Sequence, residues 1–210
     1  RSVGVADDRD NRMKALLVVG SAPCAHEDYA RACDLYPDHE TMLINGACAM
    51  IEDAEHMLSG HTVKAEQFAK ARKLAFPDAP PIRIHANTLE KHLRQYQREF
   101  PSVTDWWGAE MSSGATSAGK AALIGIKMGF NPIVLCGCPM DGSGYSIDEG
   151  QVPQDRSCQR VGDPAMQNRR TIMNYREKLV SLSKTVFKGR VFSMSGFTKM
   201  HLGFPPGQEG

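Results

Sequence analysis

The feature that most constrains the fold is a pair of continuous apolar runs, each closed by a glycine. Residues 15–19 are followed by Gly20, and residues 133–136 are followed by Gly137. Apolar residues that do not alternate with polar ones are typical of strands covered on both faces, as in a parallel sheet. The sequence therefore predicts an α/β protein with buried central strands.

Helical and extended segments alternate along the rest of the chain. Further strands are predicted at 41–44, 82–85 and 190–194. Helices are predicted over 26–35, 47–58, 64–75, 88–100, 117–128 and 172–186. In helix 117–128 the small residues Ala118, Ala122, Gly125 and Gly129 share one face, which can approach a sheet closely. We expect a Rossmann-like three-layer sandwich with a mostly parallel central sheet, and ligands outside the carboxyl ends of its strands.

Length and composition fit one domain. With 210 residues, 41% of them hydrophobic, the chain can bury a full core, which we place in one domain over 13–210 after a loose tail over 1–12. A net charge of +1 gives no general attraction to nucleic acid or to an anionic membrane. The chain begins with Arg1 and shows neither a signal peptide nor an apolar run of the ~18 residues that a membrane span needs.

The cysteines and histidines show no metal-binding spacing. Six cysteines form no C-x-x-C pair, so we expect buried free thiols rather than disulfides or zinc ligands, and hence a cytoplasmic protein. The seven histidines are scattered, and His56 and His61 are too far apart to share a helix face. A surface or capping role is expected for each histidine, and no metal site is predicted.

A long polar segment lies between the central strand and the last helix. Residues from about 139 to 165 are rich in Gly, Pro, Asp and Gln and contain few apolar residues. Such a stretch inside a compact domain is more often a functional lid than a spacer. We predict a lid loop here, with plain disorder as the alternative.

Three loops contain candidate ligand-binding residues. Thr116 and Ser117 begin a helix, where free N–H groups and the helix dipole suit a phosphate, although an N-capped helix without a ligand is the plain alternative. Gly114 to Lys120 also fits the GxxxxGK pattern of ATP-binding loops, but Ala121 replaces the magnesium-binding Ser or Thr.

Gly20 and Ser21 form the turn after the first strand, where a backbone close to a nucleotide needs small residues. Asn45 follows the second strand and could bond a base or ribose, or simply form a turn beside Gly46.

These motifs occur in an order that resembles a known family. The longest block runs from Thr116-Ser117-Ala118 through Gly129-Phe130 to the Ile133–Gly137 strand. Shorter blocks are Gly20-Ser21-Ala22-Pro23, Leu43-Ile44-Asn45, Asp141-Gly142-Ser143-Gly144-Tyr145 and Phe192-Ser193-Met194-Ser195-Gly196. Over roughly residues 14–200 they resemble the bacterial sialyltransferases of glycosyltransferase family 42, and more distantly the motility-accessory-factor proteins and the archaeal 6-hydroxymethylpterin diphosphokinases.

The resemblance implies a glycosyltransferase that moves a sugar from a nucleotide-sugar, with a CMP-sugar favoured, to a hydroxyl acceptor. By this resemblance Ser21 and Asn45 would hold the cytidine, Thr116 and Ser117 the ribose and phosphate, and Tyr145 the phosphate beneath the lid. We add Arg169 as a further cation for the departing phosphate. The resemblance implies no metal and no cofactor beyond the nucleotide-sugar co-substrate.

The chain departs from the family where the catalytic base is expected. Residues 165–169, which match the end of the lid, contain no histidine, and Pro139 replaces the aspartate that follows the central strand. This departure counts against sialyl transfer itself. A base must then come from elsewhere, and His201, Asp141 and Asp163 are candidates by position.

Two other functions and several partners stay open. One alternative is an ATP-dependent pyrophosphokinase of the pterin type, which would need magnesium, and the other is a catalytically degenerate binding protein of the same fold. The acceptor is a saccharide by resemblance, with a protein or a modified nucleobase also open, and a homo-oligomer is compatible with the sequence. Seven basic residues would line a polyanion or form a solvated helix face: Arg169, Arg170, Arg176, Lys178, Lys184, Lys188 and Arg190.

Overall fold

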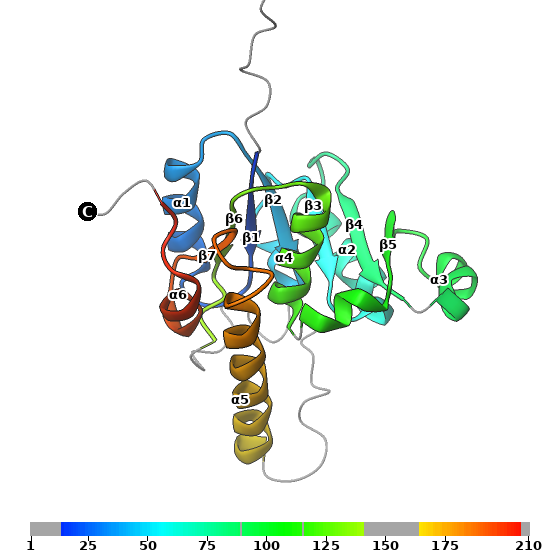
Figure 1. Ribbon diagram of the computed structural model, residues 1–210. Helices are drawn as coiled ribbons and strands as arrows, with labels where there is room; N and C mark the ends of the chain where they lie inside the picture. The colour runs from blue at the N-terminus through cyan, green and yellow to red at the C-terminus, as the bar shows by residue number, and fades with distance from the viewer. Residues whose placement is uncertain (1–13, 89, 115, 141–163, 207–210) are drawn as a thin grey trace, which may run out of the picture.

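The computed structural model describes residues 14–88, 90–114, 116–140 and 164–206. Its centre is a seven-stranded sheet with the order β5-β4-β3-β2-β1-β6-β7, in which every neighbouring pair is parallel (Figure 1). Helices flank the sheet, which confirms the predicted Rossmann-like α/β class. The predicted tail over 1–12 and nearly all of the predicted lid lie outside the described residues.

The strands are short, and most are buried. They are β1 (Ala15–Val19), β2 (His39–Ile44), β3 (His56–Ser59), β4 (Arg83–Asn87), β5 (Asp105–Trp107), β6 (Ile133–Cys136) and β7 (Val191–Ser193). The α-helices are α1 (Ala25–Leu35), α2 (Ala65–Ala75), α3 (Leu93–Glu99), α4 (Ser117–Met128), α5 (Pro164–Ser183) and α6 (Gly196–Leu202). Short 3₁₀ turns include η2 (Asn45–Ala49) and η5 (Ala109–Gly114).

The order of the strands creates a switch point beside β1. From β1 the chain builds the sheet outward to β5, and it then crosses to β6 on the other side of β1. Val19 lies opposite Leu43 of β2 and Cys136 of β6, so the carboxyl ends of these three strands meet at one edge. In open parallel sheets the crevice for a ligand forms at such an edge.

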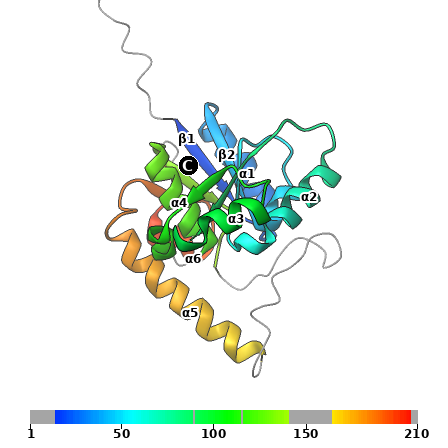
Figure 2. The same cartoon turned by 90° about the vertical axis from the view of Figure 1, so that its right-hand side faces the viewer.

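Alternating side chains of the sheet contact helices on its two faces. Leu17 and Val19 pack in a cluster with Ala25 and Ala32 of α1. Leu16 and Val18 instead pack in a cluster that includes Ala122 of α4 and, further along, residues of α5. The result is three layers, from which the first part of α5 extends away (Figures 1 and 2).

Helix α4 lies close to the sheet because one face has small side chains, as predicted for Ala122 and Gly125, whereas Gly129 is exposed after the last turn. A Cβ atom added to Gly125 would lie 2.6 Å from Cδ2 of Leu16 and 3.0 Å from Cδ1 of Ile133. The helix ends at Gly129, whose φ of 93° is left-handed and suits glycine. The predicted bounds of this helix agree with the structure.

The predicted helix over 47–58 is wrong. The segment forms the turn η2 and then strand β3, all four residues of which are buried. The buried Arg72 of α2 donates hydrogen bonds to the carbonyls of Cys48, Ile51 and Glu52. These carbonyls are therefore satisfied without a helix, and a short apolar run does not by itself distinguish the two structures.

Smaller differences occur at the edges of the fold. The helix predicted over 88–100 is shorter, because its α-helical part is Leu93–Glu99. Strand β5 and helix α6 were not predicted, and β5 is a half-buried edge strand of only three residues. None of the helices in the described ranges has the length and apolar character needed to cross a membrane.

The contact between α4 and the sheet gives the first prediction. Replacing Gly125 with Val forces a branched side chain against Leu16 and Ile133, and we expect unfolding to become easier by about 2 kcal/mol or more. Chemical denaturation monitored by circular dichroism measures the change. Lys127→Ala, an exposed position of the same helix, is the control and should stay within about 0.5 kcal/mol of the wild type. Equal stability of the two variants would contradict the packing described for this face.

Candidate functional site

The candidate site lies where the carboxyl ends of β2 and β3 approach the first turn of α4. Asn45 follows β2, Gly60 follows β3, and Ser117 begins α4. These three residues are far apart in the sequence but share hydrogen bonds. The sheet edge and the helix start therefore form one polar surface.

The side chain of Asn45 connects these segments. Its Oδ1 accepts a hydrogen bond from the Gly60 backbone N–H at 2.7 Å, and its Nδ2 donates to Ser117 Oγ at 3.2 Å. The backbone of Asn45 has a φ of 49°, in the left-handed region that asparagine tolerates better than most residues. A Cβ on Gly60 would collide with Ser117 Oγ, so a larger residue would displace the hydroxyl that Asn45 contacts.

The first turn of α4 has both used and unused N–H groups. Thr116 is the N-cap, and its Oγ1 accepts a hydrogen bond from the Gly119 N–H at 3.0 Å. The N–H groups of Ser117 and Ala118 have no acceptor in the described part of the chain, and both residues are only half-buried. With the helix dipole, two free N–H groups form a suitable site for an anion.

Lys120 adds a positive charge to the same turn. Its Nζ lies 3.5 Å from the Gly60 carbonyl oxygen, and among the described residues no carboxylate forms an ion pair with it. Burial lowers the pKa of Lys120, because the charged form loses hydration that no carboxylate of the described residues replaces. A half-buried ammonium group without an acidic partner favours binding of an anion beside it.

The switch point between β1 and β6 is packed by the protein itself. The Gly20 N–H donates to the Cys136 carbonyl at 2.8 Å. A Cβ on Gly20 would lie 2.5 Å from the Gly137 oxygen and 2.6 Å from the Cys138 sulfur. The need for glycine here is explained by the neighbouring loop, without a nucleotide.

A second polar cluster lies next to this switch point. The buried Asp28 carboxylate accepts hydrogen bonds from the Gly137 N–H at 2.9 Å and from Ser195 Oγ at 2.5 Å. Cys24 Sγ lies 3.4 Å from Ser195 Oγ. Burial is the main cause that raises the pKa of Cys24, so its thiol stays protonated and is a poor nucleophile. This cluster ties α1 to the ends of β6 and β7.

The structure brings together some of the predicted site residues. Asn45, Thr116 and Ser117 lie in one place, while Gly20 and Ser21 follow the neighbouring strand β1. His201 is exposed on α6, its ring 4.4 Å from that of Phe197, and no described contact joins it to Asn45 or Ser117.

The remaining predicted residues are not placed by the structure. Asp141, Tyr145 and Asp163 lie outside the described residues. Arg169 lies in α5, but its side chain is also outside what the structure describes.

The sequence alone did not assign Gly60 and Lys120 to the site. Gly60 lies within no motif, and its role depends on a contact with Ser117 that is distant in the sequence. In the sequence, Lys120 stands only as the end of the GxxxxGK pattern that begins at Gly114. The segment that enters this pattern is the 3₁₀ turn η5, which follows the short edge strand β5, rather than a loop after a buried strand.

The described residues hold no group of three or more His, Cys, Asp or Glu side chains that could bind a metal ion. The five cysteines in these residues are free thiols, as predicted, but only Cys48 and Cys136 are buried, and Cys158 lies outside the described residues. Comparisons of the chain with protein-family models, with curated proteins and with solved structures find no match.

The role of Asn45 gives the second prediction. Replacing Asn45 with Ala leaves the Gly60 N–H without its acceptor and keeps a left-handed backbone that alanine disfavours, so we expect a loss of about 1–3 kcal/mol in unfolding free energy. Denaturant unfolding measures the loss. Asn45→Gly removes the same hydrogen bonds but relieves the backbone, and should be less destabilised than the Ala variant. If the Ala variant is as stable as the wild type, the bridge does not hold this edge together.

Proposed function

We propose that this chain binds a nucleotide-linked sugar by its phosphate at the start of α4 and transfers the sugar to a hydroxyl acceptor. The observation that best supports the proposal is the half-buried Lys120, which has no described acidic partner and lies beside the first turn of α4. A CMP-sugar is the favoured donor, because of the resemblance to glycosyltransferase family 42. The nucleotide would extend from the phosphate toward Asn45 and the turn at Gly20 and Ser21.

The anion site is suited to stabilise a leaving group. In the proposed reaction the bond between the anomeric carbon and the phosphate oxygen breaks, and a bond from the acceptor oxygen to that carbon forms. Negative charge develops on the departing phosphate, where the N–H groups of Ser117 and Ala118 and the ammonium of Lys120 would stabilise it. Thr116 would hold the helix start in place through its bond to Gly119.

The acceptor proton needs a base. His201, Asp141 and Asp163 remain the candidates by position, and only His201 lies in the described residues. Its side chain is exposed on α6, where an acceptor could reach it. A donor that binds without transfer would favour the degenerate binding protein instead. Binding of ATP that requires magnesium would favour a pyrophosphokinase.

Loss of the Lys120 charge gives the third prediction. In Lys120→Met the stem remains but the ammonium is lost, and we expect the Kd for CMP to rise at least ~10-fold, which equals about 1.4 kcal/mol. Isothermal titration with CMP, UDP and GDP measures the affinities and names the preferred base. Lys127→Met, at the other end of the same helix, is the matched control and should keep the wild-type Kd. The proposal is wrong if no nucleotide binds at millimolar concentration, or if both variants lose affinity equally.

The pKa of Lys120 gives the fourth prediction. An anion favours the charged form, so binding raises a pKa that burial has lowered. Affinity for CMP should therefore fall as the pH rises through the lowered pKa of the free protein, and binding in that range should take up a proton. Titrations in two buffers of different ionisation enthalpy measure the proton uptake. Lys120→Met should show none, and uptake that persists in this variant would exclude Lys120 as its source.

A further inference from the structure

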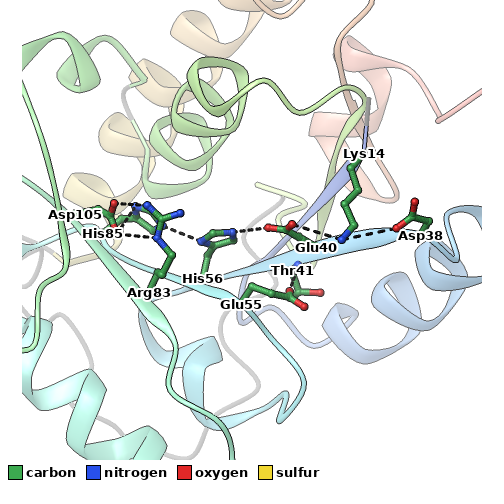
Figure 3. A network of polar contacts seen from close by, with 9 residues as sticks. All are labelled: Lys14, Asp38, Glu40, Thr41, Glu55, His56, Arg83, His85 and Asp105. Atoms are coloured by element: carbon green, nitrogen blue, oxygen red, sulfur yellow. Dashed lines mark hydrogen bonds and ion pairs between the residues drawn. The ribbon is translucent and has the colours of Figure 1, made fainter. Parts of the chain in front are cut away.

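A chain of polar side chains, buried at its centre and half-buried at its two ends, crosses four strands on the face of the sheet that α4 covers. Glu40 of β2, His56 of β3, His85 of β4 and Trp107 of β5 are joined in this order (Figure 3 shows all but Trp107). We call these four residues the histidine relay. His56 and His85 are 2% and 0% exposed, so the predicted surface or capping role is wrong for both. Strand pairing, which the local sequence does not show, buries them together.

The hydrogen bonds of the relay permit only one arrangement of protons. The indole N–H of Trp107 can only donate, so Nδ1 of His85, 3.1 Å away, must be unprotonated. His85 must then carry its proton on Nε2 and donate it to Nδ1 of His56, at 3.0 Å. His56 in turn donates from Nε2 to the Glu40 carboxylate at 2.8 Å. Every bond has one donor and one acceptor, and both histidines are neutral.

Charged groups surround the two ends of the relay. Lys14 lies 3.4 Å from Glu40 and 3.7 Å from Asp38, and Arg83 of β4 donates to the Asp105 carboxylate of β5 (Figure 3). Asp105 Oδ2 lies 3.9 Å from Nδ1 of His85. From the side of α4, the relay meets the Phe130 ring, 6.2 Å from that of His56. The carboxylates at both ends therefore have cationic partners of their own.

We propose that the histidine relay is a proton-sensitive link that holds β5 against the sheet at neutral pH and releases it in mild acid. A proton added to Nδ1 of His85 would place two donors against each other at Trp107. A proton added to Nδ1 of His56 would require His85 to accept at both nitrogens, which a neutral imidazole cannot do. A proton added to either histidine therefore breaks a hydrogen bond of the relay.

The titration of His85 agrees with this geometry. Burial is the main cause that lowers the pKa of His85 to about 4, and the nearby Asp105 carboxylate only partly opposes it. Because the ordinary pKa of an unfolded histidine is about 6.5, the unfolded chain takes up the proton first as the pH falls. Neutral His85 therefore stabilises the folded protein fully above a pH of about 6.5, and this stabilisation is lost as the pH falls from about 6.5 to about 4. The hydrogen-bonded carboxylates Glu40 and Asp105 have lowered pKa values and lose their stabilisation only at lower pH.

The relay also connects to the anion site. Trp107 is followed by Gly108 and then by η5, which packs so tightly on the first turn of α4 that a Cβ on Gly119 would collide with the Gly114 carbonyl. Release of β5 should therefore disturb the cap at Thr116 and weaken phosphate binding. This last step rests on the proposed function, whereas the relay itself does not.

Nitrogen-15 NMR of the histidine rings tests the proton arrangement directly. At pH 7.5 we expect His56 and His85 both as neutral tautomers protonated at Nε2, with His85→Gln used to assign the signals. A ring protonated at Nδ1, or an imidazolium at this pH, would overturn the relay.

Thermal unfolding tests the acid sensitivity. The wild-type Tm should fall by roughly 4–8 °C between pH 7.5 and pH 5.0 because of His85. Trp107→Phe keeps an aromatic ring but removes the indole N–H, so His85 can accept a proton at Nδ1 and pair with Asp105. Between pH 7.5 and pH 5.0, we expect the Tm of this variant to fall by less than half as much as the Tm of the wild type. The matched control is Trp106→Phe on the other face of β5, which should behave as the wild type does, and equal pH dependence in the two variants would overturn the proposal.

The effect on the site is measured as the Kd for CMP at the same two pH values. Because the titration of CMP itself is common to both proteins, it cancels when wild type is compared with Trp107→Phe. We expect the wild type to lose about 5-fold more affinity than the variant on acidification. Equal losses would overturn the connection to the site. If CMP binds neither protein at pH 7.5, the proposed function fails alone, because the tautomers and unfolding curves need no ligand.

Discussion

The side chain of Asn45 makes the two hydrogen bonds on which the candidate site depends. By bonding both Gly60 and Ser117, it fixes the distance between the carboxyl edge of the sheet and the first turn of α4. The close approach at Gly60 and the left-handed backbone of Asn45 are locally unfavourable features of this arrangement. The arrangement holds the positive end of the helix dipole and the Lys120 ammonium next to the strand ends.

The carboxyl edge has two parts with different chemistry. Beside β1 and β6, the Asp28 carboxylate is satisfied by Gly137 and Ser195, so that part is internally paired. Beside β2 and β3, the N–H groups of Ser117 and Ala118 lack an acceptor among the described residues, and Lys120, which contacts the Gly60 carbonyl, lacks an acidic partner there. The site for an anion is therefore displaced from the switch point toward α4.

The fold could be predicted from the sequence because its main signals are local. The apolar runs before Gly20 and Gly137 and the small residues of α4 each report burial on a single element. Strand β3 was missed because the carbonyls of the preceding loop are held by Arg72, from a helix further along the chain. The pairing of His56 with His85 was missed for a similar reason, since it exists only once β3 and β4 lie side by side.

The candidate site was predicted in part. Thr116, Ser117 and Asn45 were found because helix starts and strand ends have recognisable residues, and the structure joins them. The partner Gly60 and the uncompensated charge of Lys120 depend on the packing of α4 against β3, which no sequence motif encodes. A catalytic base could not be chosen, because position along the chain does not say which side chain reaches the acceptor.

The central claim is that the first turn of α4 binds the phosphate of a nucleotide. A crystal structure of the protein with CMP tests it most directly. The account predicts phosphate oxygens within hydrogen-bonding distance of the Ser117 and Ala118 N–H groups and of Lys120 Nζ. A phosphate bound elsewhere, with these N–H groups bonded to the protein's own side chains, would contradict it.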